Sequence, residues 1–466
     1  MRGLKRFVRN GLIGLLALAL LFPFFLLALI TLPLLLLLAG VAVLTPAVRK
    51  KISKGIPKWN SKKFNGTAKK LANKHILPKL YPATTRVMSH YDFIVYFDGP
   101  LGATYQVKMW DPFFSRLGGS YVIATRELPN HIDLVRSGYN SMFVKTLSVV
   151  DQLSRSGAKT VFYTNNSVKN SQMVRHRHLT HVQLLHGDSD KPSSFNPVTT
   201  MFDIVGVAGQ LGIDRYLNNG VPILPEKFRI ISRPQCGELG VATEPTKVIK
   251  TVFYATTWRD HNNGDDAGSI ENAYHAVQQL VENGYRVIFR PHPYSMKSSV
   301  DKATIERICE FFDNSEADVG FYCGIAGKKN GLMTIAECIN ESDAMLSDVT
   351  SVLSDWLYSN KPYFIIDPLN DHAALIAQNP VVRAAYYVDR EMSQLAKPLG
   401  EISKGDHLFD ERVRLRKYVL GVDLDESPVD LFVSTMKDVM QNYDKDAVAA
   451  ERIKKEYGNR SIEASI

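Results

Sequence analysis

Residues 251–293 read TVFYATTWRDHNNGDDAGSIENAYHAVQQLVENGYRVIFRPHP. The segment opens with the apolar run Thr251–Ala255 and closes with a second run, Arg286–Arg290; both are rich in the residue types that favour strands. Between them, Ser269–Asn283 has apolar residues near helical spacing and ends at an Asn-Gly pair, which suits a helix C-terminus. A strand–helix–strand unit of this kind predicts a parallel sheet covered by helices.

The same alternation extends in both directions, and we predict two α/β lobes. Periodicity is weakest over residues 237–247, where Gly, Pro and Thr accumulate, so the lobes are placed at 85–240 and 241–445, with a charged tail at 446–466. The length of 466 residues fits two lobes, since one hydrophobic core seldom grows past roughly 250–300 residues. The other predicted strands are Phe93–Phe97, Tyr121–Thr125, Ser141–Val144, Thr160–Thr164, Val182–His186, Ile204–Ala208, Ala344–Ser347 and Tyr363–Ile366.

Charge is distributed unevenly along the chain. The net charge is +9, yet residues 1–91 hold 16 Lys and Arg and no acid, so the remaining 40 basic and 47 acidic residues leave the rest at −7. A basic segment at one end favours attraction to anionic lipid headgroups. It argues against nucleic-acid binding by the folded body, which would need a basic face of its own.

A long apolar run lies inside this basic end. Residues 10–48 carry no charge and include Pro23 and Pro33, and we expect 1–48 to be a membrane segment followed by a basic linker at 49–84. The run is too long for one upright helix, so a single tilted span and a hairpin bent at the prolines both remain open. A cleaved signal peptide fits poorly, because the apolar stretch far exceeds such a peptide's usual core. Positive flanks predict that the body lies on the cytoplasmic side of the cell membrane, against an anionic inner leaflet.

The first chemical motif is His186-Gly187, at the predicted carboxyl end of a strand. Ligands of open α/β sheets bind at such ends, and a histidine there can take a proton from an attacking hydroxyl. Gly187 would let the backbone approach a ligand closely. Asp188 and Asp190 form a D-x-D pattern, which could hold a metal, or Asp188 could orient His186; an ordinary loop histidine is the plain alternative.

Two further motifs follow strands of the second lobe. In Arg290-Pro291-His292-Pro293 a guanidinium suited to gripping phosphate stands beside a histidine in a turn stiffened by two prolines. In ATTWR (255–259), Thr257 and Arg259 again put a hydroxyl and a guanidinium at a strand end. Either motif could instead be a structural turn with polar residues.

The fourth motif is Ser347-Asp348-Val349-Thr350-Ser351, which leads into VLSDWLY with Asp355 one turn further along. The unpaired N–H groups at the start of the predicted helix, with the hydroxyls of Thr350 and Ser351, suit an anion; a plain helix cap is the alternative. Four strand-end motifs rich in phosphate-binding groups together predict a pyrophosphate-containing ligand held between two lobes.

The ordered set HG (186–187), SRPQ (232–235), ATTWR (255–259), RPHP (290–293) and SDVTSVLSDWLYSNKP (347–362) resembles the CDP-glycerol glycerophosphotransferases, which build teichoic-acid chains. The resemblance covers roughly residues 85–440. It implies two Rossmann-like lobes of the glycosyltransferase-B type, with the donor site between them and no required metal or other cofactor. The loop after Gly187 departs from the family's usual Thr-Pro-Leu-Lys-like continuation, and that loop should face the acceptor.

The resemblance implies that the enzyme transfers a polyol phosphate, glycerol phosphate above all, from a CDP-activated donor to a hydroxyl of a lipid-linked teichoic-acid-like or capsular polymer. His186 would be the base, and His186, Asp188 and His292 are the candidate catalytic residues. An inverting nucleotide-sugar transferase and a non-catalytic, membrane-anchored nucleotide- or polymer-binding protein are the alternatives. The expected donor-binding residues are Gly187, Thr257, Arg259, Arg290, His292, Ser347, Asp348, Thr350, Ser351 and Asp355.

Overall fold

The computed structural model describes residues 87, 90–187, 195–257, 269–315, 318–323, 333–350, 352–367, 370–392 and 395–457. The predicted membrane segment and basic linker lie outside these residues, as do Asp188, Arg259 and Ser351. Among the helices that the structure describes, none is long and apolar enough to span a bilayer.

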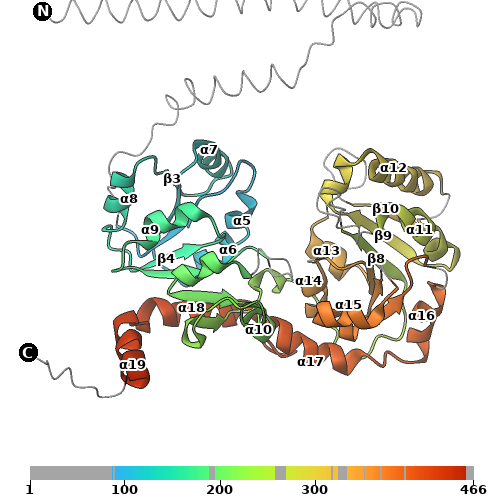
Figure 1. The fold of residues 1–466 in the computed structure, drawn as a ribbon. Coiled ribbons are helices and arrows are strands. Elements are labelled where there is room, and N and C mark those ends of the chain that lie inside the picture. Colours follow the sequence, from blue (N-terminus) through green and yellow to red (C-terminus); the bar gives the residue numbers. More distant parts are fainter. Residues whose placement is uncertain are drawn as a thin grey trace, which may run out of the picture. The chain divides into compact units, whose positions relative to one another are not determined.

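The first lobe is built on a sheet of seven strands, all parallel, in the order β3-β2-β1-β4-β5-β6-β7. Its strands β3 and β4 are labelled in Figure 1. Its central strands β1 and β4 pair with Phe93 opposite Thr160. The strands are β1 (Phe93–Phe97), β2 (Tyr121–Thr125), β3 (Ser141–Phe143), β4 (Thr160–Tyr163), β5 (Thr180–Gln183), β6 (Ile204–Val207) and β7 (Phe228–Ile230).

The second lobe repeats the plan with six described parallel strands in the order β10-β9-β8-β11-β12-β13. Both orders reverse in the middle, between β1 and β4 and between β8 and β11, as in doubly wound dinucleotide-binding folds. The prediction of two parallel α/β lobes is confirmed. The strands are β8 (Thr251–Thr256), β9 (Arg286–Pro291), β10 (Gly320–Tyr322), β11 (Ala344–Ser347), β12 (Tyr363–Ile366) and β13 (Tyr386–Val388).

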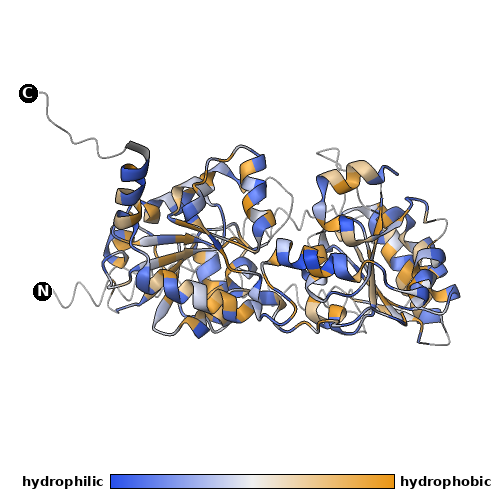
Figure 2. Ribbon diagram, turned by 90° about the horizontal axis from the view of Figure 1, so that it is seen from below, coloured by the Kyte–Doolittle hydropathy of each residue, from blue (hydrophilic) through white to orange (hydrophobic). Residues whose placement is uncertain are grey.

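Alternate residues of the central strands face opposite sides of each sheet, and both sides are buried. In β1, Phe93 and Val95 pack into one apolar cluster while Ile94 and Tyr96 pack into another. A parallel sheet covered by helices on both faces requires such continuous apolar strands, which explains the runs seen in the sequence. Figure 2 shows the strands mostly orange, whereas the helices carry both colours.

Helices connect the strands and cover both sheets. In α11 the chain leaves the helix at Asn283, and Gly284 has φ +82, a conformation that glycine adopts without strain, as the Asn-Gly pair predicts. The helices are α5 (Tyr105–Lys108), α6 (Asp111–Leu117), α7 (Leu128–Arg136), α8 (Leu147–Leu153), α9 (Ser171–Val174), α10 (Gln210–Asn218), α11 (Ala273–Glu282), α12 (Ser299–Asn314), α13 (Ile335–Asn340), α14 (Val352–Tyr358), α15 (His372–Gln378), α16 (Ala396–Glu401), α17 (Phe409–Leu420), α18 (Pro428–Asn442) and α19 (Lys445–Tyr457).

Some predicted bounds are wrong. The strand expected at Val182–His186 ends at Gln183, because Leu185 takes a left-handed conformation with φ 58 that a strand cannot continue. The strands β7, β10 and β13 were not predicted; each is only three residues long, as is β3, which was predicted one residue too long.

The C-terminal helices return to the first lobe. Phe432 of α18 packs in the apolar cluster that contains Phe93 and Trp110, and Lys445 donates a 2.7 Å hydrogen bond to the carbonyl of Leu179. Part of the chain assigned to the second lobe therefore completes the core of the first. The predicted tail begins inside α19.

Candidate functional site

The two reversals of strand order mark where each lobe can bind a ligand, because loops on either side diverge there and leave a crevice. In the first lobe, Asp98 follows β1 and residues 164–169 follow β4. In the second lobe, Thr257 follows β8 and residues 348–350 follow β11. Three of the four predicted motifs occupy such positions at or beside a reversal, and His186 lies in the loop after β5, next to β4.

His186 is held in one tautomer by its surroundings. Its Nδ1 lies 2.9 Å from the carbonyl oxygen of Thr164. A carbonyl can only accept, so Nδ1 carries the proton and Nε2 keeps its lone pair. Nε2 is therefore the nitrogen that can receive a proton from a substrate.

Gln106 faces that lone pair. The Asn165 side chain donates to Gln106 Oε1 at 3.1 Å, which turns the Gln106 amide nitrogen toward His186 Nε2 at 3.2 Å. Tyr105 packs edge-on against the imidazole, with ring centroids 6.0 Å apart. The ring is thus fixed on both nitrogens and on its face before any substrate arrives.

The electrostatic environment keeps this histidine neutral. Burial lowers the pKa of His186 below 6.5, the Thr164 carbonyl opposes that shift, and the Arg233 guanidinium adds to it. A neutral imidazole at physiological pH is what a general base requires. Gly187 beside it is exposed, and a Cβ added there would meet nothing within 4 Å among the described atoms. The described atoms thus leave the space beside Gly187 open, and close approach of a ligand there stays a prediction.

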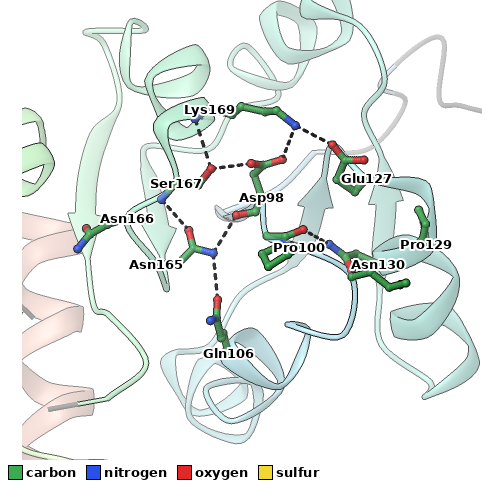
Figure 3. Close-up of a pocket in the computed structure, with 12 residues that line it drawn as sticks. Asp98, Pro100, Gln106, Glu127, Pro129, Asn130, Asn165, Asn166, Ser167 and Lys169 are labelled. Carbon is green, nitrogen blue, oxygen red and sulfur yellow. Dashed lines mark hydrogen bonds and ion pairs between the residues drawn. The ribbon is translucent and has the colours of Figure 1, made fainter. Parts of the chain in front are cut away.

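The first lobe's reversal contains a pocket of about 470 Å³ (Figure 3). Asp98 accepts a 2.6 Å bond from Ser167 Oγ, and Lys169 bridges Asp98 and Glu127 at 3.3 and 2.6 Å. None of these residues was predicted from the sequence as part of a site. The rule that selected His186, polar residues directly after a strand, applies equally to Asp98 after β1 and to Asn165 after β4.

In the second lobe, Asp348 spans the reversal and is fully buried. Its carboxylate accepts hydrogen bonds from the backbone of Thr257 at 2.7 Å and from the backbone and hydroxyl of Ser269, both at 2.8 Å. Burial raises the pKa of Asp348 to about 6, although these hydrogen bonds lower it. The side chain thus ties Thr257, directly after β8, to Ser269.

Ser347 is likewise buried and bonds to backbone only, donating to the Ala255 carbonyl at 2.6 Å and approaching its neighbour's carbonyl at 2.8 Å. Both residues were expected to bind the donor. In this structure their polar atoms serve the connection between β8 and β11, so any effect on a donor passes through the loops that they position.

Arg290 and His292 lie at the end of β9, beside β8. The Arg290 guanidinium donates to the Met333 carbonyl and to Cys323 Sγ at 3.3 Å, and the backbone of His292 donates to Thr256 at 3.0 Å. These contacts fix the turn next to the second reversal. Thr350 is partly buried just before α14, where its carbonyl accepts from Leu353 at 3.1 Å.

Asp355 was expected near the donor, and the structure gives it a protein partner. Arg233 Nε donates to its carboxylate at 2.8 Å, with side chains 13% and 22% exposed. The ion pair joins α14 to the SRPQ segment, and Ser232 in that segment has a φ of 55. Among the described residues no cluster of His, Cys, Asp and Glu could hold a metal ion.

Most of the second lobe is similar in sequence to a known protein family. Residues 232–369 match the family described as CDP-Glycerol:Poly(glycerophosphate) glycerophosphotransferase. This part of the chain is similar to that family. The match begins at SRPQ and contains the ATTWR, RPHP and SDVTS motifs, so the predicted resemblance is confirmed there.

Solved structures of low identity are also similar to the chain. The wall teichoic acid polymerase TagF has 15% identity and a TM-score of 0.48, over 85% of this chain and all of that one. A putative UDP-N-acetylglucosamine 2-epimerase from Listeria monocytogenes has 10% identity and a TM-score of 0.49, over 77% and 98%. A glycosyltransferase from Rickettsia africae ESF-5 has 10% identity and a TM-score of 0.47, over 76% and 100%. No curated protein matches the sequence.

The glycerophosphotransferase segment includes Arg290, His292, Asp348, Thr350 and Asp355. His186 and the pocket around Asp98 precede it.

Proposed function

We propose that this protein transfers glycerol phosphate from CDP-glycerol to a hydroxyl group of a teichoic-acid-like polymer and releases CMP. The observation that carries this proposal is the glycerophosphotransferase segment at 232–369. Its motifs follow three adjacent strands, β9, β8 and β11, at the reversal of the second sheet, which supports a donor site there.

In the proposed step, the acceptor oxygen attacks the β-phosphorus of the donor. A new P–O bond forms, the bond to the bridging oxygen breaks, and CMP leaves with that electron pair. Arg290 and His292 carry donor groups beside the pyrophosphate, and the loops ordered by Asp348 hold Thr257 and Thr350 against it. Preorganised groups of this kind can each contribute about 3–4 kcal/mol of transition-state stabilisation.

His186 is the proposed base. Its Nε2 takes the proton of the attacking hydroxyl, while the Thr164 carbonyl holds Nδ1–H and stabilises the imidazolium that forms. Gln106 holds Nε2 in the absence of substrate, so the acceptor hydroxyl replaces or shares that hydrogen bond. We propose no metal or other cofactor for the step, and Asp188 keeps its predicted role beside His186 as a proposal.

We also propose that the protein works at the inner face of the cell membrane on a lipid-linked acceptor. The support is the uncharged run at 10–48 with basic residues on both sides, next to a body that is net negative. An anchored enzyme and an anchored acceptor share a thin layer, which raises their effective concentration without new contacts.

The decisive experiment for the reaction is CMP release by the purified full-length chain from a panel of CDP-glycerol, CDP-ribitol and UDP-sugars. We expect CDP-glycerol to be consumed fastest and EDTA to leave the rate unchanged. Release of UDP from a UDP-sugar, with CDP-polyols inert, would assign the protein to the sugar transferases instead.

The decisive experiment for the membrane compares the full chain with a variant lacking residues 1–80. The shortened protein should still release CMP with a water-soluble acceptor and lose activity on a lipid-linked one. A variant of residues 49–466 should leave anionic vesicles at high salt, because salt screens charge, while the full chain stays bound. Extraction of the full chain by salt alone would exclude an apolar anchor.

A further inference from the structure

The proposed base, His186, follows a backbone turn that its sequence does not favour. Leu185, directly before it, has a φ of 58, in the left-handed region. There the Cβ of an ordinary residue crowds the following carbonyl oxygen, so glycine and asparagine are usual and leucine is not. The turn therefore needs contacts elsewhere in the protein that hold it in this conformation.

Both backbone polar groups of Leu185 have such contacts. Its carbonyl accepts a 2.7 Å hydrogen bond from the indole nitrogen of Trp110. Its N–H donates at 3.4 Å to Oε1 of Gln183, a fully buried side chain that also accepts from the backbone of Leu184 at 3.1 Å. The bond from Trp110 is much the shorter of the two that Leu185 makes, so the indole is the stronger restraint on the turn.

Packing fixes the indole in its turn. Trp110 is 4% exposed and lies in an apolar cluster of the first lobe, with its ring centroid 5.3 Å from that of Phe432 in α18 and 6.4 Å from that of Phe114 in α6. Interiors of this density do not let a large ring rotate without repacking. The indole N–H is therefore held against the Leu185 carbonyl, and a buried donor that lost this partner would be unfavourable.

The segment that carries Trp110 also supplies two contacts to the imidazole itself. The Gln106 amide lies 3.2 Å from Nε2 of His186, and Tyr105 packs edge-on against the ring with centroids 6.0 Å apart. These ring contacts can direct Nε2 only if the backbone that carries the imidazole stays where it is. The turn at Leu185 decides that position, because it is the link between β5 and the base.

We propose that Trp110 is a positioning residue for His186: its hydrogen bond to the Leu185 carbonyl keeps the turn left-handed and so holds Nε2 in the direction of the reacting hydroxyl. The bond offsets the resistance of leucine to this conformation. The proposal deepens the proposed function and rests on it for the role of His186 as base. The coupling of Trp110, Leu185 and the imidazole rests on the contacts alone.

The first test removes the hydrogen-bond donor and keeps an aromatic ring. In the full-length Trp110→Phe variant, the pKa of His186, followed by NMR of isotope-labelled histidine without substrate, should rise toward 6.5 because the imidazole becomes more hydrated. Turnover of CDP-glycerol should fall about ten- to a hundredfold, with the affinity for CDP unchanged. Unchanged values of both the pKa and the turnover in Trp110→Phe would overturn the proposal.

The second lobe offers a matched control. The indole of Trp356 is fully buried and donates to the backbone carbonyl of Lys361 at 3.1 Å, so Trp356→Phe removes the same kind of bond far from the base in the sequence. This variant should leave the pKa of His186 as it is in the wild type. The same rise in Trp356→Phe as in Trp110→Phe would show a general loosening of the fold and would overturn the specific role of Trp110.

A third pair of variants asks whether backbone strain is what the bond offsets. Glycine adopts a φ of 58 without crowding, so Leu185→Gly added to Trp110→Phe should restore most of the turnover and return the pKa of His186 toward its wild-type value. A double variant no better than Trp110→Phe would contradict the proposal. Leu185→Ile is isomeric but branched at Cβ, which makes the left-handed turn harder, and should by itself act in the direction of Trp110→Phe. If Trp110→Phe does not fold, Leu185→Ile decides, and wild-type behaviour in it would exclude the coupling.

The two kinds of measurement separate this proposal from the proposed function. The pKa of His186 is measured without donor, acceptor or turnover. A wild-type protein that released no CMP from CDP-glycerol would refute the transferase activity, while the expected rise of the His186 pKa in Trp110→Phe, with its reversal by Leu185→Gly, would still support the positioning of the imidazole.

Discussion

The two lobes share a strand order but use its reversal differently. Between β1 and β4 the first lobe leaves a pocket of about 470 Å³, and Gln106 in its wall is hydrogen-bonded to His186. Between β8 and β11 the second lobe places the buried carboxylate of Asp348, which joins the two loops through three hydrogen bonds.

The comparison distinguishes side chains that can contact a substrate from side chains that hold the surrounding loops in place. In the first lobe, a polar side chain that lines the pocket, such as Gln106, can exchange its hydrogen bond to the protein for one to a substrate. In the second lobe, the polar atoms of Ser347 and Asp348 are used inside the protein, so backbone groups, hydroxyls and the Arg290 turn are left to meet a ligand. A sequence motif rich in Ser and Asp therefore does not by itself distinguish the two roles.

The largest effect is expected from removing the base. His186→Ala should reduce turnover by about 10²–10⁴ while CDP binding changes little, because the base acts only on the acceptor proton. Single-turnover kinetics and calorimetry measure the two quantities. His90→Ala, at an exposed histidine of the same lobe, is the control, and wild-type turnover in His186→Ala would remove this residue from the mechanism.

The next largest effect is expected on stability, from the hydrogen bonds that the Asp348 carboxylate accepts in the second lobe. Asp348→Ala leaves three donors without a partner, two of them backbone groups, and should lower the free energy of unfolding by about 3 kcal/mol. Urea denaturation measures the change, with Asp425→Ala at an exposed position as control. A stability equal to that of the control would mean that Asp348 does not order these loops.

A smaller effect is expected at the β9 turn. Arg290→Ala should weaken CDP binding about tenfold, the loss of one charge-assisted hydrogen bond to phosphate. Arg286→Ala makes the same change at the other end of the strand, where Arg286 pairs with Asp318, and should leave CDP binding unchanged. Equal affinities in the two variants would contradict a phosphate contact at Arg290.

The smallest effect is a displacement of the pH profile. A base must be neutral to work, and the pKa of His186 is lowered, so the acidic limb of kcat/KM should lie below 6.5. Gln106→Ala should move that limb, because it frees Nε2 and opens the ring to water, while Gln279→Ala in the second lobe should not. An acidic limb above 6.5 in the wild type would show that burial does not determine the direction in which the pKa of His186 is shifted.

Asp348 also gives the fold a pH dependence of known sign. Its pKa of about 6 lies above the ordinary value of 3.8, so the folded state binds the proton more tightly than the unfolded chain. The resulting contribution to stability is complete below about 3.8 and is lost as the pH rises through about 6. Asp348→Ala should remove this component from a stability–pH curve.

Many of the strands could be predicted from short apolar runs in the sequence. Apolar runs such as Phe93–Phe97 and Ala344–Ser347 were predicted with the bounds that the structure gives, because both faces of a central parallel strand are buried. The end of β5 was wrong by three residues, since the left-handed turn at Leu185 has no glycine to mark it. The short strand β13, which was not predicted, pairs with β12, a strand about twenty residues earlier in the chain.

The sequence by itself determined the two-lobed parallel architecture, the chemistry available at the strand ends and the separation of a basic, apolar end from an acidic body. Periodicity, composition and charge are local properties, so they can be read without coordinates. Only the tertiary structure decided that Asp348 and Ser347 face inward, that Asp355 pairs with Arg233, and that Asp98, Gln106 and Asn165 meet beside His186. Those outcomes depend on which loops the strand order of the sheets brings together. The hydrogen-bond partner of a polar atom, as in the Arg233–Asp355 pair, can lie more than a hundred residues away in the sequence, so local sequence patterns do not predict it.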